Sequence, residues 1–354
     1  MPSEVRFLVL VLLLLYCETA LCQEDSKSKL IPKTFVSFPC PENNNTSELC
    51  IGNVSKEYFN SALSSTFIPA VYTTVLMLGF PSNAIALWMF CSKLRTIPTA
   101  IFNINLVISD LSFLATLPFI IHQYINGNNW VFGEATCRII TATYYGNMYS
   151  SIFFLTCISI NWYLAIVHPF LYKDLPKKNI AGYICATIWL VVFLFTLPIV
   201  LLKQTYFFKE LNIVTCHYVL PEETQNTNLF FYYLTFYIVC GFVIPLIITL
   251  FCYTLVIKTL HGLNAKWVGY IHIAAVVLMT FVICFAPSNV ILLIHNFKQD
   301  FTGDNLYSLY LTALCLGSLN TCFDPFLYYY TYFYSKWKAQ SLELESYSSL
   351  QPAA

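Results

Sequence analysis

The chain of 354 residues is strongly apolar, with 58% hydrophobic and only 10% charged residues, whereas an ordinary soluble domain has roughly 45–50% and ~25%. A water-soluble core cannot hold this excess of apolar side chains. Its 18 basic and 18 acidic residues balance to a net charge of zero, so there is no basic excess to attract a nucleic acid. Composition therefore predicts an integral membrane protein without a nucleic-acid partner.

The first apolar run, residues 7–16, is too short to cross a bilayer, because a spanning helix needs ~20 apolar residues. It follows Arg6 and leads to Ala20-Leu21-Cys22, a small-residue pattern that suits signal peptidase. We therefore expect residues 1–22 to be a cleaved signal peptide. A short membrane anchor is the alternative.

Residues 23–66 are polar and contain three glycosylation sequons, at Asn44, Asn45 and Asn53. Sequons so close together behind a signal peptide favour a location in the secretory lumen. We expect this segment to be a disordered, flexible extracellular arm.

Seven long apolar segments follow, at residues 68–91, 100–124, 135–167, 180–202, 229–257, 268–294 and 306–334. Each can cross ~30 Å of hydrocarbon as a helix, and only a helix satisfies its own backbone polar groups there. The predicted fold is an all-α seven-transmembrane helix bundle over residues 67–335, followed by a cytoplasmic tail at 336–354.

Basic residues gather in alternate connections between these spans. The connections after the first, third and fifth spans, with the start of the tail, contain one acid, Asp174, and nine basic residues: Lys93, Arg95, Lys173, Lys177, Lys178, Lys258, Lys266, Lys336 and Lys338. The other connections contain Lys203, Lys209 and Lys298 together with Glu134, Glu210, Glu222, Glu223, Asp300 and Asp304. By the positive-inside rule the first set is cytoplasmic. This predicts a multi-pass plasma-membrane protein whose N-terminus is extracellular.

Four of the 14 cysteines lie outside both the signal region and the spans: Cys40, Cys50, Cys137 and Cys216. Cys137 opens the third span and Cys216 lies between the fourth and fifth spans, on the same membrane face. In an oxidising compartment we predict a disulfide between them, which would pin the loop over the bundle. Cys40 and Cys50 either close a small loop in the arm or remain thiols, free or paired with another molecule.

Two acids, Asp110 in the second span and Asp324 in the seventh, lie near the middle of the membrane. Ionisable groups at this depth are costly and usually functional. Two carboxylates in a low dielectric repel each other unless they share a proton or a cation. We therefore predict one sodium-type site formed by Asp110, Ser151, Asn320 and Asp324, and no other cofactor.

Residues typical of one receptor class occur in order along residues 68–335. They are Gly79-Phe80-Pro81-Ser82-Asn83, Asn105-Leu106, Ser109-Asp110, Cys137, Trp189, Pro245, Tyr253, Phe281, Cys284-Phe285-Ala286-Pro287 and Asp324-Pro325-Phe326-Leu327-Tyr328. In this order and spacing they resemble the helix motifs of rhodopsin-like (class A) G-protein-coupled receptors.

A narrower set of motifs resembles the protease-activated receptors. It comprises residues 126–134, Tyr145-Gly146-Asn147-Met148-Tyr149, Cys157-Ile158-Ser159-Ile160, Thr215-Cys216-His217 and Cys284-Phe285-Ala286-Pro287-Ser288-Asn289. In the arm, Leu30-Ile31-Pro32-Lys33-Thr34-Phe35 resembles a thrombin cleavage site of that family. The resemblance implies a role in blood coagulation and hemostasis, with removal of a propeptide, residues 23–33, by a cut between Lys33 and Thr34.

The new N-terminus after this cut would be a tethered ligand, Thr34-Phe35-Val36-Ser37-Phe38. A trypsin-like protease accepts Lys or Arg before the scissile bond, and Pro32 biases the residue before it toward an extended conformation. Tethering gives an effective concentration on the order of millimolar, at which weak contacts suffice. Lys27 and Lys29 are the alternative sites of cleavage.

One departure from the family affects coupling: its Asp-Arg-Tyr triplet at the end of the third span is Asn161-Trp162-Tyr163 here. Trp162 has one indole N–H and no charge where the family has a guanidinium. A tryptophan at the lipid interface is the alternative interpretation. Tyr163, Tyr253 and Tyr328 remain to shape the cytoplasmic cavity that a G protein would enter.

Two receptor hypotheses follow. The chain is either a signalling receptor switched by a thrombin-like serine protease and coupled to a heterotrimeric G protein, or a poorly coupling co-receptor that docks the protease for a partner receptor of the same family. Trp162 favours the second. A channel or transporter would more usually show broken helices in paired halves, and the sequence contains no internal repeat. We do not expect an enzyme, because no serine, cysteine or carboxylate has an evident base at the spacing that a hydrolase needs. The remaining expected partner is membrane lipid.

Overall fold

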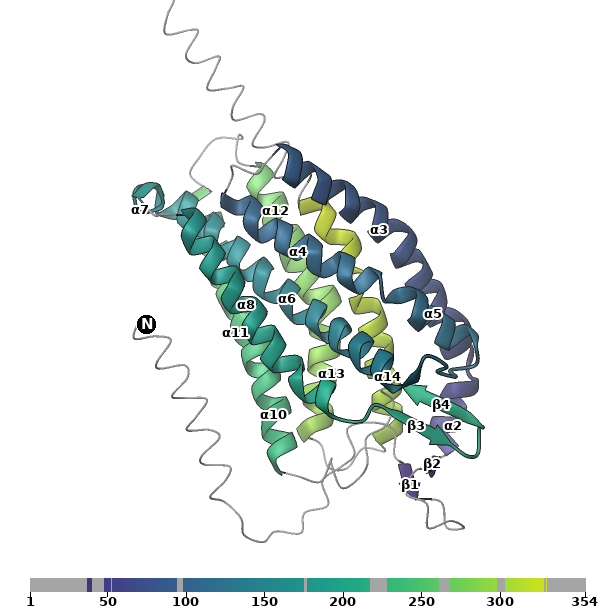
Figure 1. Cartoon of the computed structure of the whole chain (residues 1–354). Helices are drawn as coiled ribbons and strands as arrows, with labels where there is room; N and C mark the ends of the chain where they lie inside the picture. Colours follow the sequence, from purple (N-terminus) through teal and green to yellow (C-terminus); the bar gives the residue numbers. More distant parts are fainter. Residues whose placement is uncertain are drawn as a thin grey trace, which may run out of the picture.

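The computed structural model describes residues 37–39, 48–51, 53–93, 98–174, 177–216, 228–260, 268–297, 303–327 and 329. Its helices lie alongside one another in a bundle, and a small sheet lies at one end (Figure 1). We call this end the arm end. The opposite end carries the short helix α7 (Pro169–Asp174) and is called the α7 end.

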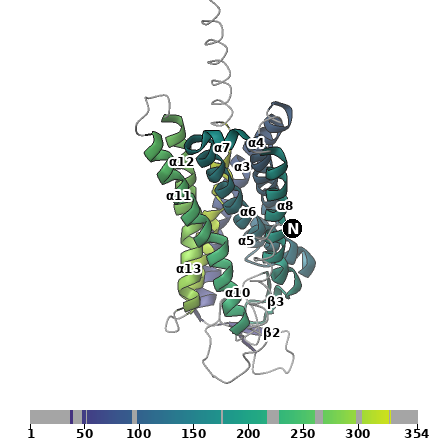
Figure 2. The same ribbon diagram turned by 90° about the vertical axis from the view of Figure 1, so that its left-hand side faces the viewer.

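The principal helices of the bundle are α3 (Ile68–Lys93), α4 (Pro98–Leu114), α5 (Leu117–Ile125), α6 (Gly133–Val167), α8 (Lys177–Leu201), α10 (Asn228–Ile238), α11 (Ile244–Leu260), α12 (Val268–Thr280), α13 (Ala286–Phe297) and α14 (Gly303–Gly317). Seen from the side, α11, α12 and α13 lie on one side of the bundle, and α3, α4 and α8 lie on the other (Figure 2). Helix α6 packs against three other long helices, α4, α8 and α11.

Within the described residues, six helical stretches are long and apolar enough to cross a membrane: Leu63–Ser92, Ala100–Ile125, Gly133–Val167, Asn179–Leu201, Tyr232–Leu260 and Ala274–Ile294. They correspond to the first six predicted spans. The seventh predicted span, 306–334, is helical in α14 and again at 320–327, with a turn at Ser318 and Leu319 between the two parts. Its last residues lie outside the described part of the chain.

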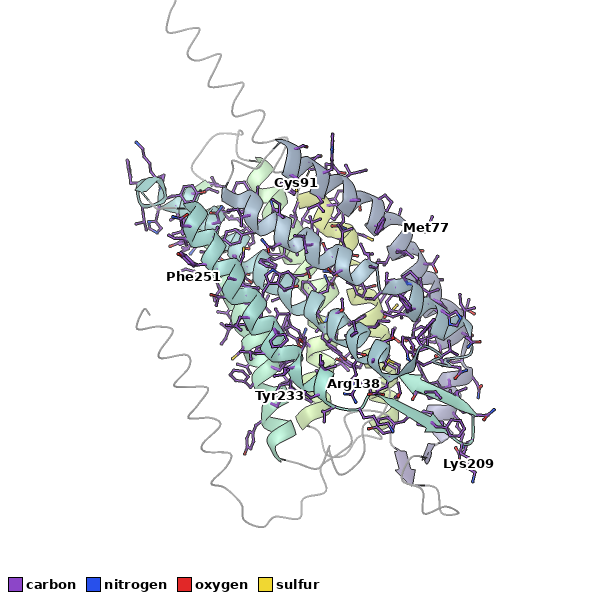
Figure 3. The ribbon with its side chains drawn as sticks, in the orientation of Figure 1. Met77, Cys91, Arg138, Lys209, Tyr233 and Phe251 are labelled. Carbon is purple, nitrogen blue, oxygen red and sulfur yellow. A yellow bond between two sulfur atoms is a disulfide. The ribbon has the colours of Figure 1, made fainter. Side chains whose placement is uncertain are left out.

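Apolar side chains cover the outside of the bundle. Met77 and Phe251 are 68% and 58% exposed and extend away from the helices that carry them (Figure 3). The interior holds fully buried aromatic rings such as Tyr149, Phe281 and Phe285. An apolar outer surface on helices that satisfy their own backbone is the arrangement that lipid requires.

Three π-helical segments interrupt the described helices: η1 (Leu63–Phe67), η2 (Val239–Val243) and η4 (Phe281–Phe285). Each ends two residues before a proline: Pro69, Pro245 or Pro287. A proline has no N–H and its ring clashes with the carbonyl four residues earlier. The wider turn of a π-helix relieves that clash, so each helix continues past its proline.

Two glycines let neighbouring helices touch. A Cβ atom at Gly241 in η2 would lie 2.5 Å from the ring of Tyr149 in α6. A Cβ atom at Gly317 in α14 would lie 2.8 Å from the backbone oxygen of Cys284 in η4. Small residues are the usual means of close packing between membrane helices, and here they bring η2 onto α6 and α14 onto η4.

The sheet at the arm end has four strands in the order β1-β2-β3-β4. They are β1 (Ser37–Pro39), β2 (Glu48–Ile51), β3 (Thr205–Phe208) and β4 (Ile213–Cys216). β3 and β4 form an antiparallel hairpin, β1 pairs antiparallel with β2, and β2 pairs parallel with β3. We expected a flexible arm, but these strands and helix α2 (Asn53–Asn60) join part of it to the loop between α8 and α10.

Candidate functional site

A disulfide joins the start of α6 to the hairpin. Cys137 and Cys216 are bonded, with their Cα atoms 5.8 Å apart. The same strand β4 is held along its backbone, because the Trp130 amide donates to the carbonyl of Val214 at 2.7 Å and the Val214 amide donates to Asn129 Oδ1 at 2.9 Å. The hairpin is therefore fixed over the arm end of α6, as the cysteine positions predicted.

Glu134 holds the other strand of the hairpin. Its carboxylate accepts the backbone N–H groups of Gln204 and Thr205, each at 2.8 Å, and the hydroxyl of Thr205. It also pairs with Arg138 one turn later, at 2.5 Å. Arg138, labelled in Figure 3, in turn donates to the carbonyl of Val200 at 3.1 Å. From the sequence, Glu134 was expected only to be one of the acids between the spans, and its hydrogen bonds to the hairpin were not predicted.

Helix α2, in the part of the arm nearest the bundle, also packs on the hairpin. Lys56 of α2 pairs with Glu210 at 2.8 Å, and the rings of Phe59 and Phe208 meet edge to face with centroids 5.9 Å apart. The side chain of Asn128 donates to the Phe59 carbonyl at 3.3 Å and accepts the Ser64 hydroxyl at 2.9 Å. Burial raises the pKa of Tyr58 in α2 above its ordinary value, so its hydroxyl stays neutral.

A cavity of about 80 Å³ lies beside the disulfide, between α3, α5, α6 and α14. Its walls are mostly aromatic and apolar: Tyr72, Ile120, Tyr124, Trp130, Ile140, Tyr144, Tyr145, Leu311 and Leu314, with Gln123, Thr141 and Cys216. Gln123 is only 5% exposed, and its Nε2 has no hydrogen-bond acceptor among the described residues. A buried donor without a partner calls for a ligand or a water. The cavity suits an aromatic or apolar group that carries a hydrogen-bond acceptor.

The two intramembrane acids lie together in the middle of the bundle. Asp110 and Asp324 are both 0% exposed, and they lie close enough for their charges to interact. The Asn147 amide donates to Asp110 at 3.0 Å and lies 3.5 Å from the Ser151 hydroxyl. Asn320 lines, with Asn147, a cavity of about 10 Å³, which is room for roughly one water or small ion.

This polar core offers oxygen ligands of mixed type. The described residues contain no group of three or more His, Cys, Asp or Glu that could hold a metal. A cation here would rely on two carboxylates with hydroxyl and amide oxygens, which suit a hard ion. The four residues predicted to form the sodium-type site all lie buried in this core.

Comparison with known proteins decides the family. Residues 82–328 match the model of the 7 transmembrane receptor (rhodopsin family). The chain is 46% identical to Proteinase-activated receptor 3 of Homo sapiens over 295 residues, covering 83% of this chain and 79% of that receptor. It is 40% identical to Proteinase-activated receptor 2 of Mus musculus over 288 residues, covering 79% and 72%. The chain belongs to the proteinase-activated receptors of the rhodopsin family.

A third relative, Proteinase-activated receptor 1 of Xenopus laevis, is 35% identical over 286 residues, covering 78% of this chain and 67% of that receptor. Membership in this family confirms the resemblance found in the sequence. It also confirms that the chain is a receptor and not an enzyme.

At the α7 end of this proteinase-activated receptor, Trp162 packs against an apolar cluster. The cluster contains Val256 and Leu260 of α11, with Tyr163 and Ile166 against it. The Tyr163 hydroxyl meets His168 Nε2 at 2.9 Å. Tyr253 is buried, and Tyr328 lies outside the described residues. At position 162, where the resemblance led us to expect an arginine, the structure therefore has a tryptophan that packs between α6 and α11.

The predicted arm sites are described only in part. Ser37 and Phe38 of the predicted ligand lie in β1, and Asn53 begins α2. The predicted arm sites that lie outside the described part of the chain are Lys33, Thr34, Phe35, Val36, Cys40, Asn44 and Asn45. The pairing of Cys40 with Cys50 therefore stays a prediction.

Proposed function

We propose that this receptor is switched by a thrombin-like serine protease that cuts between Lys33 and Thr34, so that residues 34–38 become a tethered ligand. The observation that supports this most directly is the four-stranded sheet. It joins β1, which begins only three residues after Thr34, to the hairpin whose Cys216 lines the arm-end cavity. Ser37 and Phe38 of the ligand segment are thereby part of the same sheet as a strand that lines the cavity.

The chemical character of the ligand segment matches that of the arm-end cavity. Residues 34–38 contain two phenylalanines and a chain of peptide carbonyls. The cavity offers tyrosine walls and the unpaired donor of Gln123. Aromatic rings contribute large apolar contact area, and a carbonyl of the segment would satisfy the Gln123 amide. Because the segment is tethered, an effective concentration on the order of millimolar makes a weak site sufficient.

The cut is tested by digesting the full-length receptor with thrombin and sequencing the new N-terminus. Thr34 is the expected first residue, and Lys33→Ala should abolish the cut. Lys29→Ala is the matched control and should be cut at the native rate. A dominant cut after Lys27 or Lys29 would show that another bond is the substrate.

Cleavage by an extracellular protease requires the arm to lie outside the cell. We propose removal of residues 1–22 as a signal peptide and glycosylation at Asn44, Asn45 and Asn53. An epitope placed after residue 22 should be stained on intact cells, and a glycosidase should lower the apparent mass. Staining only after permeabilisation would reverse the proposed orientation.

A second function is favoured by Trp162. Its apolar contacts with α11 stand where the family arginine would meet a G protein, so the receptor could present the protease to a partner receptor of its own family. Calcium and cyclic-AMP responses to thrombin separate the two functions. A response from this chain alone supports direct coupling to a heterotrimeric G protein. A response that requires a co-expressed relative supports the co-receptor.

The polar core is proposed to bind sodium through Asp110, Ser151, Asn320 and Asp324 in the inactive bundle. Two buried carboxylates close to each other are stabilised by a proton or a cation between them. Raising sodium at constant ionic strength, with choline as the control ion, should raise the melting temperature of the native receptor. Asp110→Asn should remove the sodium-specific part of that increase.

A further inference from the structure

Strand β1 is the outer edge of the arm-end sheet, and it contains part of the proposed ligand. Ser37 pairs with Ile51, and Phe38 pairs with Cys50. Both residues belong to the segment 34–38 that cleavage would expose. In the uncleaved receptor the second half of the ligand is therefore already engaged, in a contact with its own arm.

This contact keeps the second half of the ligand away from the cavity. β1 and β4 are separated by β2 and β3, so three strand spacings of roughly 4.8 Å place them about 14 Å apart. Cys216 at the end of β4 lines the cavity. While β1 stays paired, Ser37 and Phe38 therefore remain at the opposite edge of the sheet from the strand that reaches the cavity.

The neighbouring strand is much more firmly held. β2 pairs with β3 through Glu48 and Leu49, and α2, which follows it, is seated by the Lys56–Glu210 ion pair and by Phe59 against Phe208. β1 pairs only with β2. A strand of three residues on the edge of a sheet has little stability of its own. It is the part of the sheet that can leave without disturbing the rest.

We propose that the pairing of β1 with β2 is an autoinhibitory contact: it holds the ligand segment off the cavity, and the receptor switches on only when β1 leaves β2. This rests on the proposed tethered-ligand function. Cleavage creates a free terminus, and its binding in the cavity competes with the strand pairing. The pairing favours the inactive receptor over the active one, because it exists only in the inactive state. It therefore sets the threshold for activation after the cut.

Hydrogen exchange on the full-length receptor in lipid nanodiscs tests the contact without requiring G-protein coupling. Hydrogen-bonded and non-hydrogen-bonded pairs alternate along an antiparallel ladder, so in the intact receptor the amides of one of two neighbouring pairs should be protected: Ser37 with Ile51, or Phe38 with Cys50. After complete cleavage at Lys33 their exchange should become roughly tenfold faster or more, because the loss of ladder hydrogen bonds removes protection. Exchange in β3 and β4 should stay unchanged.

Protection that persists in the fully cleaved receptor overturns the proposal, as does exchange that is already fast in the intact receptor. Failure of the proposed function itself looks different. In that case the digest contains no new terminus at Thr34. Alternatively, β1 leaves β2 after cleavage, but a photo-cross-linker placed in residues 34–38 forms no cross-link to any residue of the cavity.

A proline variant tests the contact independently. Ile51 pairs with Ser37 and with no residue of β3, so Ile51→Pro should disrupt the β1 ladder and leave β2 on β3. In the intact receptor the protected amide of β1 should exchange in this variant as fast as in the cleaved native chain, and after cleavage the variant should reach its response at a several-fold lower protease dose. Ile51→Ala removes the side chain, keeps the N–H and should behave as native. Equal dose–response curves for Ile51→Pro and Ile51→Ala at equal cleavage rates would overturn the autoinhibitory role.

Discussion

The two ends of the bundle are built by different means. At the arm end, segments far apart in the sequence are joined by a disulfide, by the Glu134 carboxylate and by strand pairing. At the α7 end, Trp162 and its neighbours pack against the apolar side chains of Val256 and Leu260 in α11. The arm end is thus held by directional contacts between distant segments, whereas the described contacts at the α7 end include apolar packing between two neighbouring helices. The two ends can therefore be altered separately by substitution.

The largest effect should come from removing the covalent tie. The double variant Cys137→Ser/Cys216→Ser should lower the free energy of unfolding by about 2–5 kcal/mol, as is typical of native disulfides. Thermal unfolding in detergent and hydrogen exchange of the hairpin would measure it. Cys91→Ser, which alters an exposed free thiol, should change neither. If exchange also rises at the α7 end, the two ends are not independent.

Loss of the Glu134 charge should come next. Glu134→Gln removes the ion pair with Arg138 and weakens the bonds to Gln204 and Thr205, and charge-assisted hydrogen bonds contribute about 1.5–3 kcal/mol each. We expect a lower melting temperature and faster exchange in β3, with G-protein contacts unaffected. The exposed acid Glu57 provides the matched control, Glu57→Gln. An unchanged hairpin in Glu134→Gln would mean that the disulfide alone positions the loop.

Restoring the family charge should change the α7 end only. The double variant Trp162→Arg with Asn161→Asp restores the arginine together with an acid that can pair with it in the inactive state. G-protein activation after cleavage should rise by roughly tenfold to a hundredfold, because the guanidinium adds contacts that exist only in the coupled state. The measurement is nucleotide exchange at equal surface expression. Trp162→Phe keeps an aromatic side chain without charge and should resemble the native chain. Full coupling by the native chain would remove the main support for the co-receptor.

The smallest effect should come from the arm-end cavity. Gln123→Leu removes one neutral donor, whose hydrogen bond contributes about 0.5–1.5 kcal/mol, so the potency of a soluble Thr-Phe-Val-Ser-Phe peptide should fall by roughly threefold to tenfold. Ile125→Ala, at an exposed position nearby, is the control. Equal potency in both variants would place the ligand elsewhere.

The sequence predicted what depends on composition and spacing. The lengths of the apolar segments identified the spans, and two cysteines on one membrane face identified the disulfide. The burial of Asp110 beside Asp324 followed from their depth in the membrane. Each of these features can be inferred from single positions or from runs along the chain.

The sequence could not predict contacts that depend on packing between distant segments. Nothing in three or four residues around Phe38 or Leu49 indicates that β2 would pair with β3, more than 150 residues later. The roles of Glu134 and Gln123 likewise appear only when the hairpin and the cavity walls are in place. The prolines at 69, 245 and 287 do not by themselves predict the π-helical segments, because Pro81 and Pro198 lie inside the α-helices α3 and α8.

Those π-helical segments also change the helical phase. A π turn accommodates about one extra residue, and one residue corresponds to about 100° around an α-helix. Side chains of α10 before η2 therefore face a different direction from the one that the 3.6-residue period of α11 would assign to them. Tyr233 and Tyr237 reach the interior, where Tyr233 donates to the Phe195 carbonyl at 2.5 Å and Tyr237 lies against the ring of Tyr149, with centroids 4.1 Å apart. Deleting one residue within Val239–Val243 would rotate these tyrosines toward lipid while leaving the composition of the span almost unchanged.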